Sequence, residues 1–210
     1  PSVRLSIWAM AWSTVQSTLW GFLVGVTSGF VAGLVLGRCG GLPRLASPFI
    51  VAFNSLPRIA LVPLITMIFG FGLLAKIVLA WSIVFFIVFF NTFEGARSVD
   101  ADLIHSARFL GATEGQVMRT VIVPSTLAWT FASLTPSISF ALIGVVVGEF
   151  IGGESGGGLG YLIIQSLGTL NAADMMVALL VLGAIGIVMA LGIRQVEARL
   201  LRWRPEYRKP

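Results

Sequence analysis

Residues 175–193 read MMVALLVLGAIGIVMALGI, and this run without a charge or a proline decides the fold class. A hydrocarbon layer about 30 Å thick needs around 20 apolar residues in a helix, and a helix satisfies its own backbone polar groups. The run therefore predicts a membrane-spanning helix. Of the 210 residues, 57% are hydrophobic and 11% are charged, with a mean hydropathy of +0.95. Because soluble domains have roughly a quarter of their residues charged, the composition excludes an ordinary soluble enzyme, a disordered chain and a fibrous repeat.

Further apolar segments extend this prediction along the chain. Spanning helices are predicted at 15–37, 48–69, 73–93, 124–147 and 175–193. We therefore predict an all-α, polytopic helical membrane protein with five visible spanning helices, forming a single domain over the whole chain. Glycines spaced by four in the first helix predict close packing against a neighbouring helix.

The basic residues predict the orientation of these helices. Alternation of five helices places 38–47, 94–123 and the C-terminal tail on one side, where most Lys and Arg residues lie. The other side carries only Arg4 and Lys76. Because positive charge concentrates on the cytoplasmic side, we expect the 94–123 connection and the C-terminus to be cytoplasmic.

The 94–123 connection is too long and too regular for a simple turn. Asp100 can cap a short helix, Gly111 suits a helix end with positive φ, and Thr113 with Gln116 has the spacing of a capping box. One face of the first short helix carries Leu103, Ile104, Ala107 and Leu110. Either an amphipathic segment lies on lipid headgroups, or this apolar face docks onto a cytoplasmic partner.

The stretch IHSARFLGATEGQVMRTVIVP (104–124) resembles the cytoplasmic signature loop of bacterial ABC-importer permeases. That pattern is Glu-Ala-Ala, three residues, Gly, nine residues, then Ile-x-Leu-Pro, and Ala107, Gly111 and Pro124 occupy matching positions. The spacing is intact, whereas four residues differ from the family pattern. The differing residues are His105, Ser106, Val121 and Val123.

Two more stretches are similar to the branch of this family that imports sulfonates, taurine, nitrate or thiamine-pyrimidine precursors. They are NSLPRIALVPLITMIFGFGLLAKI (54–77) and ALIGVVVGEFIGGESGGGLGYLI (141–163). The resemblance implies a type I ABC-importer permease fold in the bacterial inner membrane, with a further helix before Pro1. It also implies two copies of a separate ATPase, a second permease copy in a homodimer, a solute-binding protein, and a small anionic or organic solute.

The resemblance and the residue pattern together assign candidate sites. The predicted ATPase-coupling residues are Leu103, Ile104, His105, Ala107, Arg108, Leu110, Gly111 and Pro124. The predicted pathway or gate residues are Asn54, Pro57, Arg58 and Glu149. For Arg58, the alternative is a side chain that snorkels at the cytoplasmic boundary. For Glu149, it is a plain interfacial carboxylate.

The sequence contains no G-x-x-x-x-G-K-[ST] phosphate-binding loop. We therefore expect a non-enzymatic transport subunit without a cofactor of its own, with ATP used by the partner. One histidine and one cysteine argue against a metal site, and the scattered basic residues argue against nucleic-acid binding. The glycine run at 152–160 is expected to be a flexible entrance to a short helix at 161–167. An ion-coupled secondary transporter or channel subunit is the alternative function, and it predicts an internal repeat.

Overall fold

The structure is a computed structural model that describes residues 2–38, 52 and 57–201, and the elements within them are helical. The elements in chain order are α1 (Ser2–Arg38), the 3-10 turn η1 (Arg58–Leu61), α3 (Val62–Phe69), α4 (Leu73–Arg97), α5 (Ala101–Phe109), α6 (Glu114–Val117), the π-helical turn η2 (Met118–Ile122), α7 (Val123–Gly156), α8 (Leu159–Gly168) and α9 (Ala172–Leu200). The predicted all-α class is therefore confirmed for the described residues.

Four helical stretches among the described residues are long and apolar enough to cross a membrane. The prediction of five spanning helices is therefore wrong. They are Ile7–Arg38, Leu73–Arg97, Glu114–Gly153 and Ala172–Leu200. The predicted helix at 48–69 is the one that fails. Its described part forms only η1 and α3, and the helical stretch Arg58–Phe69 reaches about 18 Å at 1.5 Å per residue.

Local sequence explains why this segment stays short. Pro57 has an extended conformation and precedes η1, and a proline lies in the first turn of α3. Gly70 then ends α3 with a φ of 75°, a conformation that glycine adopts without strain. Helix α4 begins three residues after Gly70, so α3 and α4 form a tight helical hairpin.

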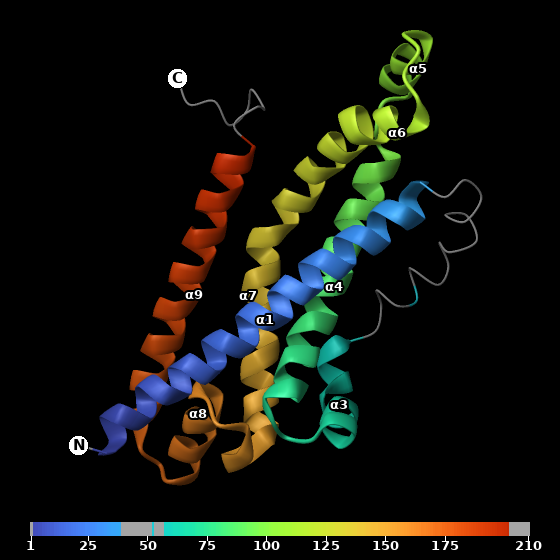
Figure 1. Cartoon of the computed structure of the whole chain (residues 1–210). Coiled ribbons are helices and arrows are strands. Elements are labelled where there is room, and N and C mark those ends of the chain that lie inside the picture. The colour runs from blue at the N-terminus through green and yellow to red at the C-terminus, as the bar shows by residue number, and fades with distance from the viewer. Residues whose placement is uncertain (1, 39–51, 53–56, 202–210) are drawn as a thin grey trace.

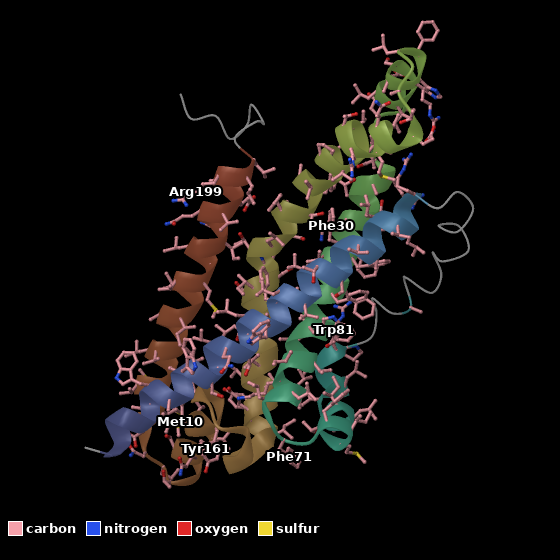
Figure 2. All side chains as sticks on the ribbon, in the orientation of Figure 1. Met10, Phe30, Phe71, Trp81, Tyr161 and Arg199 are labelled. Atoms are coloured by element: carbon pink, nitrogen blue, oxygen red, sulfur yellow. The ribbon has the colours of Figure 1, made fainter. Side chains whose placement is uncertain are left out.

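Helix α1 packs against α4 along a row of glycines, as the spacing by four predicted. The row consists of Gly21, Gly25, Gly29, Gly33 and Gly37. A Cβ atom added at Gly29 would lie 2.7 Å from the carbonyl oxygen of Phe85. Trp81 of α4, labelled in Figure 2, also donates a hydrogen bond from Nε1 to Ser28 Oγ of α1 at 3.0 Å. Small residues thus let the two backbones approach closely.

The main core lies where α1, α4 and α7 meet. Its buried side chains are Phe22, Ala80, Val84, Val88, Leu134, Ile138, Ala141 and Val145. A hydrogen bond of 2.9 Å between the hydroxyls of Thr92 and Thr130 joins α4 to α7 inside this bundle. By contrast, α9 lies at the periphery. Only 6% of the residues in its most apolar 18-residue stretch are buried.

The elements divide between two ends of the bundle (Figure 1). Helices α5 and α6 project at one end, where α1, α4 and α9 also finish; we call it the α5–α6 end. Helices α3 and α8 lie at the opposite end, the α8 end. The predicted short helix at 161–167 is confirmed as α8, which is slightly longer.

Candidate functional site

The projecting α5–α6 hairpin is built from local caps that the sequence predicted. The Asp100 side chain accepts a hydrogen bond of 2.9 Å from the backbone N–H of Asp102 and caps α5. Gly111 has a φ of 86° and turns the chain after α5. The predicted capping box is present, with the Thr113 and Gln116 side chains bonded to each other's backbone N–H groups. These contacts give the hairpin a defined shape.

An ion pair crosses the bend at Gly111, and the sequence pattern did not predict it. Arg108 donates from Nε and Nη2 to the two carboxylate oxygens of Glu114 at 2.9 Å and 3.0 Å. This two-point geometry fixes the guanidinium plane as well as its position. Arg108 is one of the predicted ATPase-coupling residues, and its guanidinium is bonded to Glu114 within the hairpin while the side chain stays 44% exposed.

The predicted apolar face divides into an inner and an outer part. Ile104 is buried with Val117 and Ile122, in a cluster that Leu34 of α1 also contacts. Ile104 therefore supports the hairpin from inside and does not lie on its surface. Ala107 is half-buried beside this cluster.

The tip of the hairpin is apolar and exposed. Leu103 is 55% exposed, Leu110 is 86% exposed, and Phe109 is 95% exposed. Phe109 was not predicted, because it lies outside the apolar face that helical spacing defines. With His105, Ser106 and Leu110 it lines a surface cavity of about 410 Å³. The tip thus offers an aromatic and aliphatic surface at the extreme end of the molecule.

The hairpin is joined to the membrane bundle without a break. Helical structure runs from Glu114 through α6 and η2 into α7, where Pro124 is the second residue. The π-helical turn keeps the chain helical just before this proline. A displacement of α6 would therefore be passed to α7 through continuous helix.

A buried ion pair lies near the α8 end. Lys76 Nζ of α4 lies 3.3 Å from Glu149 Oε1 of α7, with side-chain exposures of 4% and 0%. Glu149 also accepts hydrogen bonds from Thr14 Oγ1 of α1 and from the backbone N–H of Gly160 in α8, each at 2.9 Å. Four helices thus meet at one carboxylate.

Lys76 completes the network from the other side. It donates to Ser13 Oγ at 2.8 Å and to the carbonyl of Gly157 at 3.0 Å. A side chain at Gly158 would overlap the Glu149 carboxylate. The glycine run therefore makes a close backbone contact at these positions. Glu149 is a buried internal group, unlike the plain interfacial carboxylate that was the alternative to a pathway or gate residue. In the sequence Lys76 was counted only as a basic residue on the non-cytoplasmic side, so its role in this network was missed.

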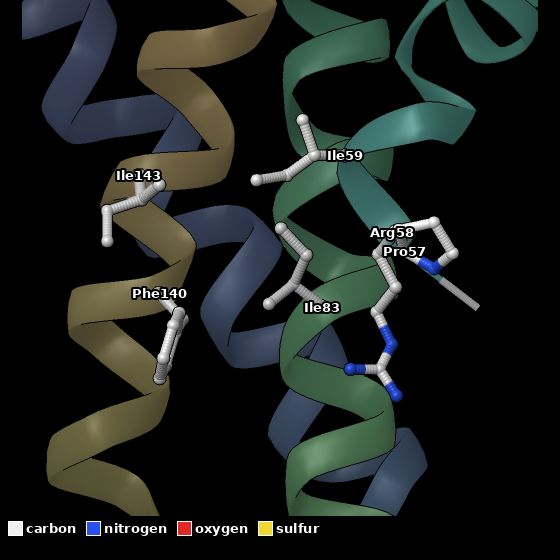
Figure 3. A pocket seen from close by; sticks show the side chains of 6 residues that line it. All are labelled: Pro57, Arg58, Ile59, Ile83, Phe140 and Ile143. Carbon is white, nitrogen blue, oxygen red and sulfur yellow. The ribbon is translucent and has the colours of Figure 1, made fainter. Parts of the chain in front are cut away.

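Arg58 lies beside the middle of α4. Its guanidinium carbon is 4.8 Å from the ring centroid of Phe86, a residue near the centre of the 25-residue helix. Arg58 therefore packs beside the middle of α4 and not beside either of its ends. Pro57 precedes Arg58, and both residues line a cavity of about 260 Å³ (Figure 3). Asn54 lies outside the described residues. Among the described residues no cluster of three or more His, Cys, Asp or Glu side chains could hold a metal ion.

Comparison with known proteins agrees with this architecture. Residues 25–202 match the family described as "Binding-protein-dependent transport system inner membrane component". A methionine ABC transporter solved in an inward-facing conformation has a TM-score of 0.78 at 23% identity, covering 93% of this chain and 96% of that chain. An amino acid ABC transporter has a TM-score of 0.72 at 20% identity, covering 97% and 96%. These two structures establish the fold.

Three transport permease proteins are similar in sequence, each over 77% of this chain. The formylaminopyrimidine transport permease protein of Halalkalibacterium halodurans is 30% identical, and the match covers 64% of its length. The riboflavin transport system permease protein of Chloroflexus aurantiacus is 33% identical, and the match covers 60% of its length. The taurine transport system permease protein of Escherichia coli is 31% identical, and the match covers 58% of its length.

The chain thus covers less than two thirds of these relatives. Taurine and formylaminopyrimidine match the branch that the sequence motifs suggested. Because the family match extends over most of the chain and the helical architecture agrees with it, this chain belongs to the binding-protein-dependent transport system inner membrane components.

Proposed function

We propose that the chain is the membrane-spanning permease subunit of an ATP-driven ABC importer. The observation that carries this proposal is the exposed Phe109–Leu110 tip on a hairpin that continues as helix into α7. An exposed apolar surface on a rigid support is typical of a docking site. Its partner is a separate ATPase, present in two copies, which docks on the 94–123 connection.

The remaining parts of the proposal follow from family membership. A second copy of the permease completes the pathway as a homodimer, and a solute-binding protein delivers a small organic or anionic solute at the α8 end. The α5–α6 end and the C-terminus are cytoplasmic, in agreement with the basic residues gathered there. ATP drives transport only if it favours one conformation of the complex over the other, and the α6–η2–α7 helix transmits that preference.

Docking is tested by co-purification of the ATPase with variants of the hairpin tip. Phe109→Asp is expected to weaken binding by at least about thirtyfold, since a central aromatic contact contributes about 2 kcal/mol or more. Gly111→Val is expected to weaken it too, because a β-branched residue is strained at a φ of 86°.

Leu170→Asp is the matched control for this test. Leu170 is 88% exposed and lies in the turn between α8 and α9, far from the hairpin. This variant should retain the ATPase. If Phe109→Asp also retains it, the docking proposal is wrong. If solute uptake persists without ATP and follows an ion gradient, the secondary-transporter alternative is correct.

A further inference from the structure

The start of α8 is attached to α1, α4 and α7 by hydrogen bonds around the buried Lys76–Glu149 pair. We call this group the α8 junction; its residues are Ser13, Thr14, Lys76, Glu149, Gly157, Leu159 and Gly160. The carbonyl of Gly157 accepts from Ser13 Oγ at 2.8 Å as well as from Lys76. The N–H of Leu159 donates to Thr14 Oγ1 at 3.1 Å. The first amides of α8, which have no partner within the helix, are thus bonded to side chains of other helices.

Helix α8 lies between two bends of the chain. Gly153 and Gly157 precede it with φ values of 56° and 29°, and Leu170 follows it with a φ of 53°. Leu170 is the one non-glycine residue with a positive φ in the described part of the chain, and this conformation is strained for leucine. Hinges in proteins are a few loop or terminal residues of this kind. The bends therefore allow α8 to rotate relative to α7 and α9.

Beyond the junction, α8 is only partly buried. Leu162 and Ser166 are its other buried residues. The Ser166 hydroxyl is buried without a hydrogen-bond partner among the described residues, and such an unsatisfied group opposes the packing that buries it. The ten residues of α8 extend about 15 Å, which is too short to cross a membrane. The position of α8 therefore depends largely on the junction.

Both charges of the junction lie within about one turn of a helix end. Lys76 is the fourth residue of α4, and Glu149 lies four residues before Gly153, where the helical geometry of α7 is interrupted. The start of α8 covers the carboxylate so closely that a side chain at Gly158 would overlap it. Any displacement of α7 relative to α8 therefore lengthens these contacts. A buried ion pair is often no more stabilising than apolar side chains of similar size, so its presence favours a contact that opens and closes.

We propose that the α8 junction is a releasable contact through which the two ends of the molecule regulate each other. Helix α7 carries Glu149 near one end, and at the other end it continues through η2 into α6 of the hairpin (Figure 1). A displacement of α7 separates Glu149 from the start of α8, and α8 then moves about its two bends. Because coupling between sites is reciprocal, a displacement of α8 acts on the hairpin in return. This inference rests on the proposed function and assigns Lys76 and Glu149 as positioning residues.

Hydrogen exchange of the full chain in phosphatidylcholine nanodiscs, read at the Leu159 and Gly160 amides, tests whether the junction opens as a unit. Thr14→Val removes the acceptor of Leu159 but not that of Gly160. We expect it to accelerate exchange at Gly160 at least about fivefold, the factor that corresponds to one net hydrogen bond. Ser13→Ala touches neither amide, and it should accelerate exchange at both by more than about twofold.

Thr92→Val is the matched control for these variants. Thr92 and Thr14 are both fully buried, and Thr92 joins α4 to α7 through Thr130, 16 residues along α4 from Lys76. Its loss should leave exchange at Leu159 and Gly160 unchanged.

The same measurement on the permease–ATPase complex tests the coupling. Trapping the ATPase with ATP and vanadate should accelerate exchange at Leu159 and Gly160 at least about fivefold, because displacement of α7 opens the junction. Protection of the Phe109 and Leu110 amides by the ATPase reports docking in the same sample.

Three outcomes would overturn the proposal. One is unchanged exchange at Gly160 in Thr14→Val, or at both amides in Ser13→Ala. Another is equal acceleration in Thr92→Val, which would mean that any loosening of the bundle releases α8. The third is unchanged exchange at α8 in a trapped complex whose hairpin tip is protected. An unprotected tip would instead refute the docking proposal on which the coupling rests, so the two failures are distinguishable.

Discussion

Replacement of Lys76 by methionine should destabilise the helix bundle strongly. The substitution keeps the length of the side chain and leaves Glu149 fully buried without the ammonium group 3.3 Å away. Removing one partner of a buried ion pair costs about 3–5 kcal/mol. Thr14 and the Gly160 N–H still donate to the carboxylate, so we expect a loss of about 3 kcal/mol in the free energy of unfolding.

The complementary variants separate the charge pair from its hydrogen bonds. In Glu149→Gln the amide oxygen can still accept from Gly160, and Lys76 retains Ser13 Oγ as an acceptor. We therefore expect a smaller loss of about 1–3 kcal/mol. The double variant Lys76→Met/Glu149→Gln contains neither charge and should be no less stable than Lys76→Met alone. That result would show energetic coupling between the two sites.

The free energy of unfolding can be measured by titrating detergent-solubilised protein with sodium dodecyl sulfate and following helical circular dichroism. Arg97→Met is the matched control on the same helix. Its partner Glu94 is 3.7 Å away, and the two side chains are 47% and 61% exposed, so the loss should stay below about 1 kcal/mol. If Lys76→Met is as stable as Arg97→Met, the pair does not hold the bundle together and the reasoning is refuted.

Three further substitutions test the packing and the caps. Gly29→Ala should cost about 1–3 kcal/mol, because its Cβ would lie 2.7 Å from a backbone oxygen of α4; Gly183→Ala, with no atom within 4 Å, should not destabilise the same unfolding transition. Thr92→Val should cost about 1 kcal/mol, since Thr130 loses its hydrogen bond to α4 and keeps only the bond to the carbonyl of Thr126; equal stability of the variant and wild type would contradict this. Thr113→Ala should cost about 1 kcal/mol locally, seen as faster hydrogen exchange of the α6 amides, and unchanged exchange would show that the capping box is dispensable.

The local features of the candidate site were predictable from sequence. The Asp100 cap, the Gly111 bend and the capping box depend on residues two to four positions apart, so their chemistry is visible in the chain itself. The error at 48–69 has a local cause as well. Apolar content alone suggested a spanning helix, whereas the prolines and Gly70 divide the segment into short pieces.

Sequence by itself therefore determined the membrane class, the presence of the four long helices, the glycine contact face and the capped hairpin, because each follows from periodicity or from neighbours along the chain. Tertiary structure alone decided which charges meet. Glu149 is 73 residues from Lys76 and 135 from Thr14, and Arg58 is brought beside Phe86, near the middle of α4, only by the packing of η1 on that helix. Such pairings depend on how separate helices pack in space, and no local pattern encodes that.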